Sequence, residues 1–215
     1  FDRLGFPPDH PATDMQDSFF VRAEDGAGPR TLLRTHTSNM QVREMLRRKP
    51  PMAVCSPGQV YRRDDDVTHS PMFFQIEAFL VDRHVSFAHL RGTLQRFADR
   101  MFAPGVPVRM RPSYFPFVEP GAEVDIGCTI CNGWRGDAGA SERQAACRVC
   151  KGTGYLEVLG CGMIHPVVFE ACGIDPEQWT GFALGMGVDR ITMLRHDVGN
   201  IRLLYENDVR FLEQL

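Results

Sequence analysis

A dense cluster of charges separates two apolar stretches in the segment YRRDDDVTHSPMFFQIE, residues 61–77. Arg62 and Asp64 lie two residues apart, so their side chains point to the same side wherever the chain is extended. Because a guanidinium keeps its proton at any physiological pH, Arg62 is suited to binding a phosphate group. The alternative is a plain hairpin turn whose charges face water.

The apolar stretch after this cluster predicts a strand with two different faces. Phe73, Gln75 and Glu77 alternate onto one face, and Phe74 and Ile76 fall on the other. An aromatic ring and two polar groups on one face, beside an arginine, indicate the floor of a small-molecule site rather than a packed core.

A second candidate site lies in the glycine-rich segment GFALGMGVDR, residues 181–190. Glycines let the backbone approach a ligand closely, and Arg190 is expected just inside a helix that follows glycine-rich turns. Backbone N–H groups at a helix start and a guanidinium can bind one anion together. Glycines that only let a helix pack closely on a sheet would give the same pattern. The prediction of an anion site in this segment therefore depends on the charged hairpin as well.

Four cysteines have the spacing of a metal site. Cys128 and Cys131 form one Cys-x-x-Cys pair, and Cys147 and Cys150 form a second pair 15 residues later. This spacing predicts a structural Zn²⁺, and four cysteine ligands leave no open coordination position for catalysis. Empty reduced thiols and a 4Fe–4S cluster are the alternatives. The cluster is expected to staple a long hairpin between two strands.

The composition limits the classes of protein that fit. A chain of 215 residues, with 43% hydrophobic and 24% charged residues, suits one domain or one domain with an insert. Its net charge of −3 excludes a general attraction to nucleic acid. Seven cysteines are an odd number, which argues against a secreted disulfide scaffold and favours a reducing cytoplasm. No apolar run is long enough to predict a membrane span.

The expected fold is α+β, with a mainly antiparallel sheet flanked by helices. A helix after Ser38 should bury Met40, Val42, Met45 and Leu46. Other helices are expected in 86–102, from 165, in the later part of 181–196, and in part of 200–215. Strands are expected in 52–64 (broken at Pro57-Gly58), 72–82, 107–127 and from 154.

Several of these segments together resemble the catalytic domain of class II aminoacyl-tRNA synthetases. Arg62-x-Asp64 resembles the second motif of that class, and Gly185-x-Gly187-x-Asp189-Arg190 resembles its third motif. The blocks LLRTHTSNMQVR, FFQIEAFLVD, RPSYFPFVEPGAEVDI and LGCGMIHPVV are similar to the α subunit of bacterial phenylalanyl-tRNA synthetase. The resemblance covers nearly the whole chain. It implies a catalytic domain over residues 1–215 with a four-cysteine zinc-knuckle insert at 128–150, and an N-terminal coiled-coil tRNA arm outside the chain.

The family activates phenylalanine with ATP, and the resemblance assigns this chemistry to matching residues. The implied ATP-binding residues are Arg62, Asp64, His69, Phe73 and Arg190. Arg62 and Arg190 are the expected catalytic residues, and Arg62 should stabilise charge at the α-phosphate. Mg²⁺ should accompany the phosphates, with Glu119 as the expected acidic residue near it.

The amino-acid pocket of the family also has counterparts here. The implied phenylalanine-binding residues are His36, Ser38, Gln75, Glu77, Phe115, Phe117 and Ala183. Glu77 suits an ammonium group, and two phenylalanines on one side of a strand can meet a substrate ring edge-to-face. From the strand pattern alone, both phenylalanines would be read as core.

Three residues depart from the family pattern. Leu184 stands where phenylalanine is common, Asp189 where glutamate is common, and Gln16 where some members have tryptophan. Leu184 could reshape the wall of the pocket, whereas Asp189 is a mild chemical change.

The implied function is synthesis of phenylalanyl-adenylate and transfer of phenylalanine to tRNA(Phe). The implied partner is a phenylalanyl-tRNA synthetase β subunit in an α2β2 heterotetramer. Two alternatives stay open: a class II paralogue that acts on a non-tRNA acceptor, and a zinc-knuckle module that binds proteins. The second alternative leaves Arg62 and Arg190 without a role.

Overall fold

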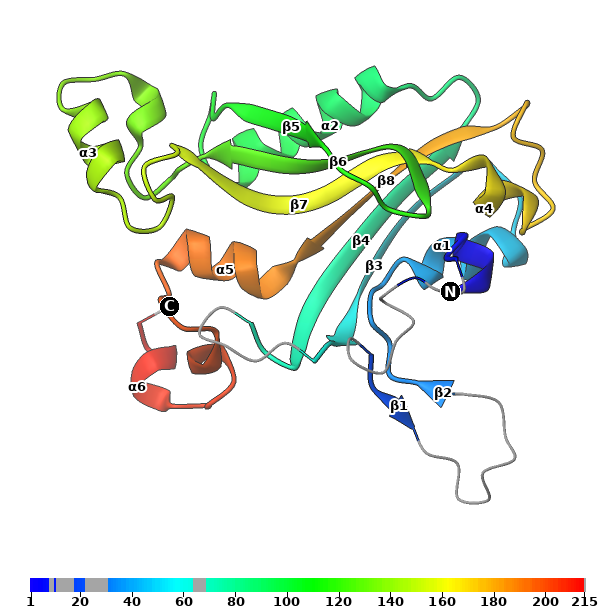
Figure 1. Ribbon diagram of the computed structural model, residues 1–215, viewed down its shortest axis with the longest axis horizontal. Coiled ribbons are helices and arrows are strands. Elements are labelled where there is room, and N and C mark those ends of the chain that lie inside the picture. Colours follow the sequence, from blue (N-terminus) through cyan, green and yellow to red (C-terminus); the bar gives the residue numbers. More distant parts are fainter. Residues whose placement is uncertain (8–9, 11–17, 22–30, 64–68, 215) are drawn as a thin grey trace.

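A computed structural model describes residues 1–7, 10, 18–21, 31–63 and 69–214 of the chain. Its centre is a six-stranded sheet in the order β3-β4-β8-β7-β6-β5 (Figure 1). Its strands are β3 (Met52–Tyr61), β4 (Met72–Asp82), β5 (Val108–Pro112), β6 (Val118–Gly127), β7 (Tyr155–Ile164) and β8 (Thr180–Gly187). Every neighbouring pair in this sheet is antiparallel, which confirms the predicted α+β fold with an antiparallel sheet.

Short helices and one long helix surround the sheet. The α-helices are α1 (Asn39–Arg47), α2 (Phe87–Met101), α3 (Ala140–Ala146), α4 (Pro166–Glu170), α5 (Val188–His196) and α6 (Val209–Leu212). Three 3-10 helices, η1 (Asp2–Leu4), η3 (Gly133–Arg135) and η4 (Ile201–Leu204), and a small sheet of β1 (Phe20–Val21) and β2 (Thr31–Leu32) complete the described elements. None of the described helices is both long and apolar enough to cross a bilayer.

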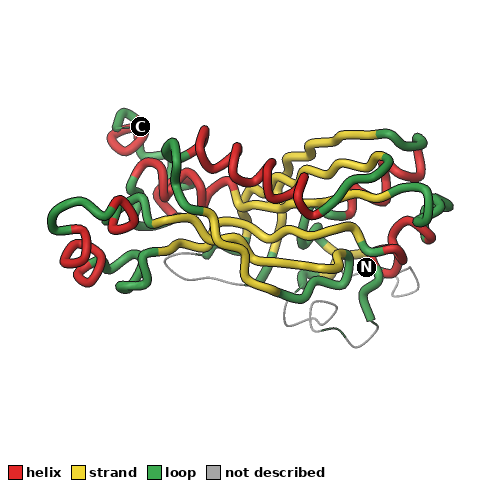
Figure 2. The backbone as a smooth tube through the Cα atoms, turned by 90° about the horizontal axis from the view of Figure 1, so that it is seen from above, coloured by secondary structure: helices red, strands yellow, loops and turns green. Residues whose placement is uncertain are grey.

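Helix α2 packs on one face of the sheet (Figures 1 and 2). Leu90 and Leu94 on this helix are buried in one core cluster with Val124 and Ile126 of β6. Glu77 and Glu123 alternate with the apolar residues of their strands, so they point to the opposite face of the sheet. That opposite face carries these polar groups beside a second core cluster, in which Phe79 and Val81 of β4 pack with residues of α1 and α4.

Helix α1 corrects one prediction about which side chains are buried. Val42 and Met45 are buried as expected, but Leu46 is 52% exposed. The place expected for an apolar side chain is taken by Gln41, which is fully buried and hydrogen-bonded to Glu77 of β4. A polar partner on another element decides the rotation of this helix, and helical spacing alone does not reveal it.

Two strand predictions were also wrong in detail. Pro57 and Gly58 do not break the strand, because β3 lies at the edge of the sheet and its proline needs no partner on the outer side. The glycines expected in turns at 181–187 belong instead to β8, between β4 and β7. Small residues are needed there because β8 forms the floor of a cavity.

The cysteine segment leaves the sheet between β6 and β7. Figures 1 and 2 show it projecting beyond the ends of these strands as a separate small lobe that contains α3. Within the lobe, α3 packs against η3. The lobe is therefore an insert in a hairpin, as the sequence predicts.

Candidate active site

A cavity of about 640 Å³ opens on the sheet face opposite α2. It brings together these predicted residues: His36, Ser38, Arg62, His69, Phe73, Gln75, Glu77, Phe115, Phe117, Ala183 and Arg190. They come from segments far apart in the chain, so their convergence in one cavity is a result of the fold. Asp64 and Gln16 lie outside the described residues.

The floor of the cavity is a row of small residues between two carboxylates. In register across the sheet, Glu77 lies opposite Gly185, Gly185 opposite Gly160, and Gly160 opposite Glu123. A Cβ atom at Gly160 would approach the Phe115 ring to 3.0 Å, and one at Gly185 would approach a Glu77 oxygen to 3.4 Å. Glycine at both places keeps the floor low enough for a ligand to lie across it.

Glu77 is a polar group of the cavity that is fixed by burial and by two hydrogen bonds. Its side chain is 3% exposed, and Ser38 Oγ and Gln41 Nε2 each donate a hydrogen bond to a different carboxylate oxygen. Burial raises the pKa of Glu77 to about 7, and the two hydrogen bonds oppose that rise. Ser38 stands at the N-cap of α1, yet its hydroxyl makes no cap bond and serves Glu77 instead. A fixed buried carboxylate of this kind suits a primary ammonium group.

His36 also lines the cavity, and its ring is neutral. Burial, and then the charge of Arg62, lower the pKa of His36 to about 3. Both ring nitrogens are buried without a hydrogen-bond partner among the described residues. Such nitrogens are available to a polar ligand, because a buried polar atom without a partner is costly. The ring of Phe6 stacks on His36 at 5.8 Å with an interplanar angle of 7°.

An aromatic wall continues from His36. The ring centroids of His36 and Phe117 are 5.7 Å apart, and those of Phe117 and Phe115 are 6.2 Å apart with a tilt of 32°. Both phenylalanines are only half-buried and line the cavity, so they are not simply core residues. Ala183 is buried in the floor beside them, where its small side chain leaves room for an aromatic group.

The other end of the cavity carries the cations. Arg62 directly follows β3, and its Nε donates to the carbonyl oxygen of Thr35 at 3.1 Å. Its guanidinium carbon lies 5.3 Å from the centre of the Phe73 ring. Arg190 is on the first turn of α5, directly after β8, and His69 also lines this part of the cavity. Two permanent cations beside a half-buried ring that lines the cavity suit a phosphate group joined to a base.

Asp189, a departure from the family pattern, has a clear structural role. It is buried and accepts hydrogen bonds from the backbone N–H of Phe74 at 2.6 Å and from the hydroxyl of Tyr205. Burial and the neighbouring carboxylate raise the pKa of Tyr205 above its usual range. Asp189 therefore ties α5 to β4 and fixes the helix turn that carries Arg190.

The acidic residues differ from what the sequence analysis expected. Glu119 is not among the described residues that line the cavity; its carboxylate is 76% exposed and lies 3.1 Å from Nε2 of His165. Glu123 and Glu157 line the cavity instead, and both pair with Arg111, at 2.8 Å and 3.0 Å. The role of Glu119 as a magnesium ligand stays a prediction.

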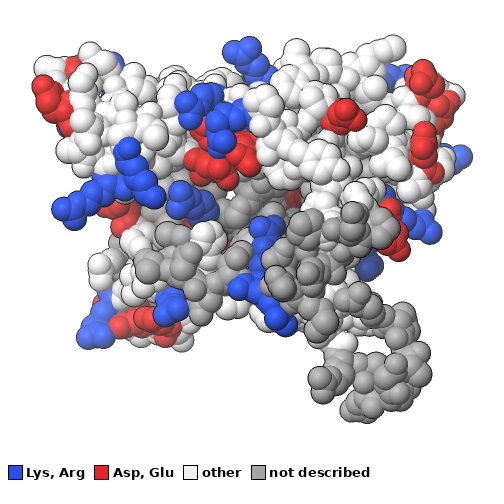
Figure 3. Space-filling view, in the orientation of Figure 1, with Lys and Arg blue, Asp and Glu red and all other residues white. Residues whose placement is uncertain are grey.

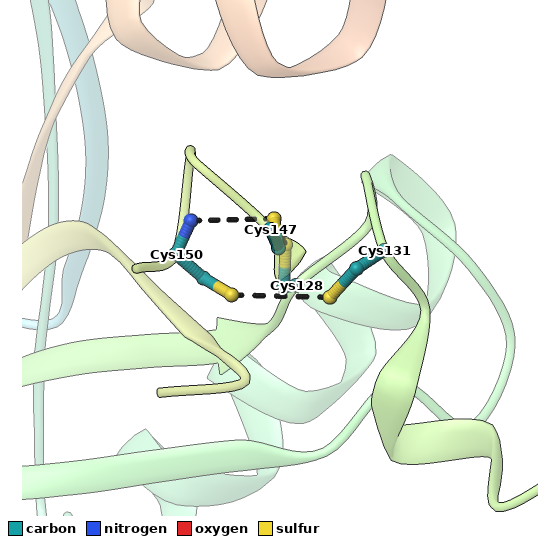
Figure 4. A group of neighbouring side chains, drawn as sticks. All are labelled: Cys128, Cys131, Cys147 and Cys150. Carbon is teal, nitrogen blue, oxygen red and sulfur yellow. Dashed lines mark hydrogen bonds between the residues drawn. The ribbon is translucent and has the colours of Figure 1, made fainter. Parts of the chain in front are cut away.

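The four cysteines of the insert lie together (Figure 4). Cys128 and Cys147 have their Sγ atoms 3.9 Å apart, Cys131 and Cys150 have theirs 3.8 Å apart, and all four lie within 4.8 Å of one another. A tetrahedral zinc site with Zn–S bonds of about 2.3 Å places its sulfur atoms about 3.8 Å apart. The backbone N–H of Cys150 also points at Cys147 Sγ. The geometry thus suits a four-coordinate ion.

The family-model comparison decides the family. The model described as "tRNA synthetases class II core domain (F)" matches residues 1–215. The chain belongs to this class II synthetase core family. The antiparallel sheet with its cavity is thus a class II synthetase core, and the fold predicted from the two motifs is confirmed.

Curated relatives of this class II core carry a more specific name. The chain is 55% identical over 214 residues to a protein of Nitratidesulfovibrio vulgaris (strain DSM 19637 / Miyazaki F) named "Phenylalanine--tRNA ligase alpha subunit". It is 53% identical over 214 residues to a protein of the same name from Aquifex aeolicus (strain VF5). Both matches cover 100% of this chain and 59% of the relative, so the chain spans about three-fifths of the relatives' length.

A solved structure supports the class II fold independently. A pyrrolysyl-tRNA synthetase of Desulfitobacterium hafniense superposes with a TM-score of 0.57 at 17% identity, covering 94% of this chain and 61% of that one. Identity at this level speaks for the shared fold alone.

Some cavity residues were missed by the sequence analysis. Phe6 lies in a proline-rich opening segment with no periodic pattern. Gln41 is not among the described residues that line the cavity, but it supports Glu77 by a hydrogen bond from the buried face of α1. Glu123 and Glu157 alternate like ordinary solvent-facing strand residues. Only the polar character of Gln41 between the inward-facing positions of its helix could have signalled a buried partner.

Proposed function

We propose that this chain is the catalytic core of a phenylalanyl-tRNA synthetase α subunit, which activates phenylalanine with ATP and transfers it to tRNA(Phe). The observation that carries the proposal is one cavity that joins the buried carboxylate of Glu77 to the cations Arg62 and Arg190 across a floor of glycines. The names of relatives at 53–55% identity support the same function.

Phenylalanine would bind at the carboxylate end of the cavity. Its ammonium group would bind Glu77, with Ser38 and Gln75 beside it, and its ring would lie against Phe115 and Phe117. His36, held neutral, could then contact the substrate without adding a second positive charge next to the ammonium. Tyrosine would bring a hydroxyl into an apolar wall without a partner, which gives moderate discrimination.

ATP would bind at the cationic end. Phe73 would stack on one face of the adenine and Arg190 would cover the other, with Asp64 near the amino group and His69 near the pyrophosphate. The substrate carboxylate is already ionised, so its attack on the α-phosphorus needs no general base. Arg62 would stabilise the charge that builds up on the α-phosphate as pyrophosphate leaves. Catalysis would then be positioning plus electrostatics.

Two metal ions belong to this proposal. Bound Mg²⁺ would neutralise phosphate charge. The family resemblance assigns Glu119 to this ion, although its exposed carboxylate lies beside His165 and not among the described residues that line the cavity. Zn²⁺ would be held by the four cysteines of the insert at 128–150, whose sulfur spacing fits it. Its part is structural, because four thiolates fill its coordination sphere.

The complete protein would work with partners. We infer a β subunit in an α2β2 heterotetramer, tRNA(Phe) as the acceptor, and a cytoplasmic location, with residues 1–215 as the catalytic domain. The subunit name of the relatives supports the first of these inferences.

Phenylalanine-dependent ATP–pyrophosphate exchange tests the proposed function. The full-length α subunit, purified together with its β subunit, should catalyse exchange with phenylalanine and more weakly with tyrosine, and should charge tRNA(Phe). Exchange without charging would favour a paralogue with another acceptor. No exchange with any amino acid, in a preparation that binds ATP, would contradict the proposal.

A further inference from the structure

The cysteine lobe carries the opposite charge to the rest of the chain. Residues 128–154 contain four arginine and lysine side chains and two acidic ones, whereas the whole chain has a net charge of −3. Two of the four cations have partners inside the lobe: Arg143 pairs with Asp137, and Arg135 lies over the Trp134 ring at 4.7 Å. The other two, Arg148 and Lys151, are exposed and form no ion pair with any described residue.

These two cations lie on a loop whose backbone is fixed by the cysteine cluster. Arg148 lies between Cys147 and Cys150, and Lys151 directly follows Cys150. Four convergent sulfur atoms fix the backbone of this loop, which we call the second knuckle (residues 147–154). A rigid backbone lowers the entropy cost of binding a ligand through its side chains.

Lys151 of the second knuckle has a backbone conformation that is unfavourable for lysine. The residue after the second cysteine of each pair has a left-handed backbone: Asn132 has φ 52° and Lys151 has φ 51°. Asparagine and glycine adopt this conformation readily, whereas lysine does so at a cost. The first pair of cysteines uses the residue type that fits the backbone, and the second knuckle keeps a cation at the equivalent place.

The second knuckle lies close to the cavity. Strand β7 begins at Tyr155, directly after the knuckle, and Glu157 two residues later lines the cavity. Gly154, the last residue of the knuckle, is three residues from Glu157, and three residues of a strand span about 10 Å. Figure 3 shows basic side chains gathered at the left of this face, where the projecting lobe joins the rest of the molecule.

We propose that Arg148 and Lys151 of the second knuckle bind phosphate groups of the tRNA acceptor end as it enters the cavity. This inference rests on the proposed function, because only a tRNA-charging enzyme must bring an RNA end to this cavity. Charge complementarity favours RNA over a protein partner, since two cations without an ion pair on a rigid loop suit a polyanion. The overall acidic chain would then need such a local basic surface.

Three variants of the full-length α subunit with its β subunit test this surface. They are Lys151→Asn, Arg148→Gln and the double variant. Each neutralised phosphate contact contributes about 0.7 to 0.9 to the slope of log affinity against log salt. The double variant should therefore lower that slope for tRNA(Phe) by about 1.5 and raise the KM for tRNA about tenfold at low salt, from the same principle. Phenylalanine-dependent pyrophosphate exchange should not change.

The controls separate a contact from a folding defect. Lys151→Asn copies the residue of the first cysteine pair, so its melting temperature should be unchanged or higher while tRNA binding weakens. Arg91→Gln/Arg96→Gln on α2 makes the same charge change on the covered side of the sheet and should leave the tRNA KM unchanged.

Three outcomes would overturn the inference. These are an unchanged tRNA KM and salt slope in the double variant, weaker tRNA binding only in step with lost zinc, and weaker association with the β subunit in place of weaker tRNA binding. A wild-type enzyme without any pyrophosphate exchange would overturn the proposed function instead. Direct tRNA binding at several salt concentrations would still decide whether the knuckle contacts RNA.

Discussion

At the scale of single residues, Glu77 is the group that selects for a positively charged ligand. This buried carboxylate has two donors, Ser38 and Gln41, and neither of them is a cation. An arriving ammonium group would supply the missing charge and favour the ionised form. Burial thus keeps the site ready for a cation and makes it sensitive to pH.

The affinity for phenylalanine should fall as the pH drops below about 7, the raised pKa of Glu77. Well below that pH the loss should approach about tenfold per unit, because each bound ammonium needs an ionised Glu77. Calorimetric titration from pH 5 to 8 measures this. Glu77→Gln should bind weakly with a nearly flat pH profile, and a wild-type profile that is flat over this range would contradict the role given to Glu77.

The same shift has a consequence for stability with a defined sign. The folded chain holds the Glu77 proton up to pH about 7, whereas an unfolded chain releases it near the ordinary value of 4.5. The folded state therefore binds more protons between these values, and this contribution to the free energy of unfolding declines as the pH rises through that window. Ammonium binding should reduce the decline.

Gln41→Leu should shift the pH midpoint of phenylalanine binding upward. The change removes the donor to one oxygen of Glu77, so the ionised carboxylate loses a hydrogen bond worth about 1–2 kcal/mol. Affinity at pH 7 should fall about tenfold by the same reasoning. A purely structural role for Gln41 would lower stability and leave the midpoint of the pH profile in place.

At the scale of elements, the alternation of strands β4 and β6 is what the sequence predicts best. Phe73, Gln75 and Glu77 share a face as expected, because a period of two survives any tertiary context. The glycine strand β8 was missed, since glycine has low strand propensity and its reason for being there is a cavity formed with β4 and β7. Local preference disfavours this strand, and only its neighbours β4 and β7 explain both the strand and its small residues.

The edge strand β5 is attached to β6 by a buried charge network. Asp125 is 2% exposed and accepts hydrogen bonds from Arg109 and Arg111 at 2.7–3.0 Å. The two arginines hold the pKa of Asp125 below its usual value against the opposing effect of burial. The network fixes the strand that leads to the aromatic wall at Phe115.

Asp125→Ala should lower the free energy of unfolding by about 1–3 kcal/mol, because it removes the buried acceptor that Arg109 and Arg111 share, while their side chains stay 46% and 42% exposed and can be hydrated. Urea unfolding monitored by circular dichroism measures this. Glu157→Ala removes another partner of Arg111, but one that is 59% exposed, and should cost less than about 1 kcal/mol. Equal losses in the two variants would show that burial of Asp125 does not decide its contribution.

At the scale of the whole molecule, a class II core and a cysteine lobe share one hairpin. The cysteine spacing predicts the cluster from sequence because short metal-ligand motifs fix their own local geometry. The cavity, by contrast, joins Phe6 near one end of the chain to Arg190 near the other. Contacts over such sequence distances leave no periodic signal, which is why Phe6 and Gln41 were missed, whereas most of the residues proposed from the family motifs line the cavity.

Metal analysis should find one zinc per chain, lost in Cys147→Ser. Removing one thiolate from a four-sulfur site exposes the metal and lowers its affinity. Cys172→Ser, which changes a cysteine outside the cluster, should keep its zinc. Wild-type protein purified without chelator and lacking zinc, or containing iron in its place, would contradict the assignment of the metal.

The central claim is that Arg62 stabilises the transition state of amino-acid activation. Arg62→Ala should lower phenylalanine-dependent pyrophosphate exchange by about 10²–10³-fold, as is usual when one donor to developing charge is removed, while the dissociation constant for phenylalanine changes less than about threefold. Arg63→Ala, at the exposed neighbouring residue, should change neither quantity much. A variant at Arg62 whose exchange rate is retained once phenylalanine is saturating would contradict the account.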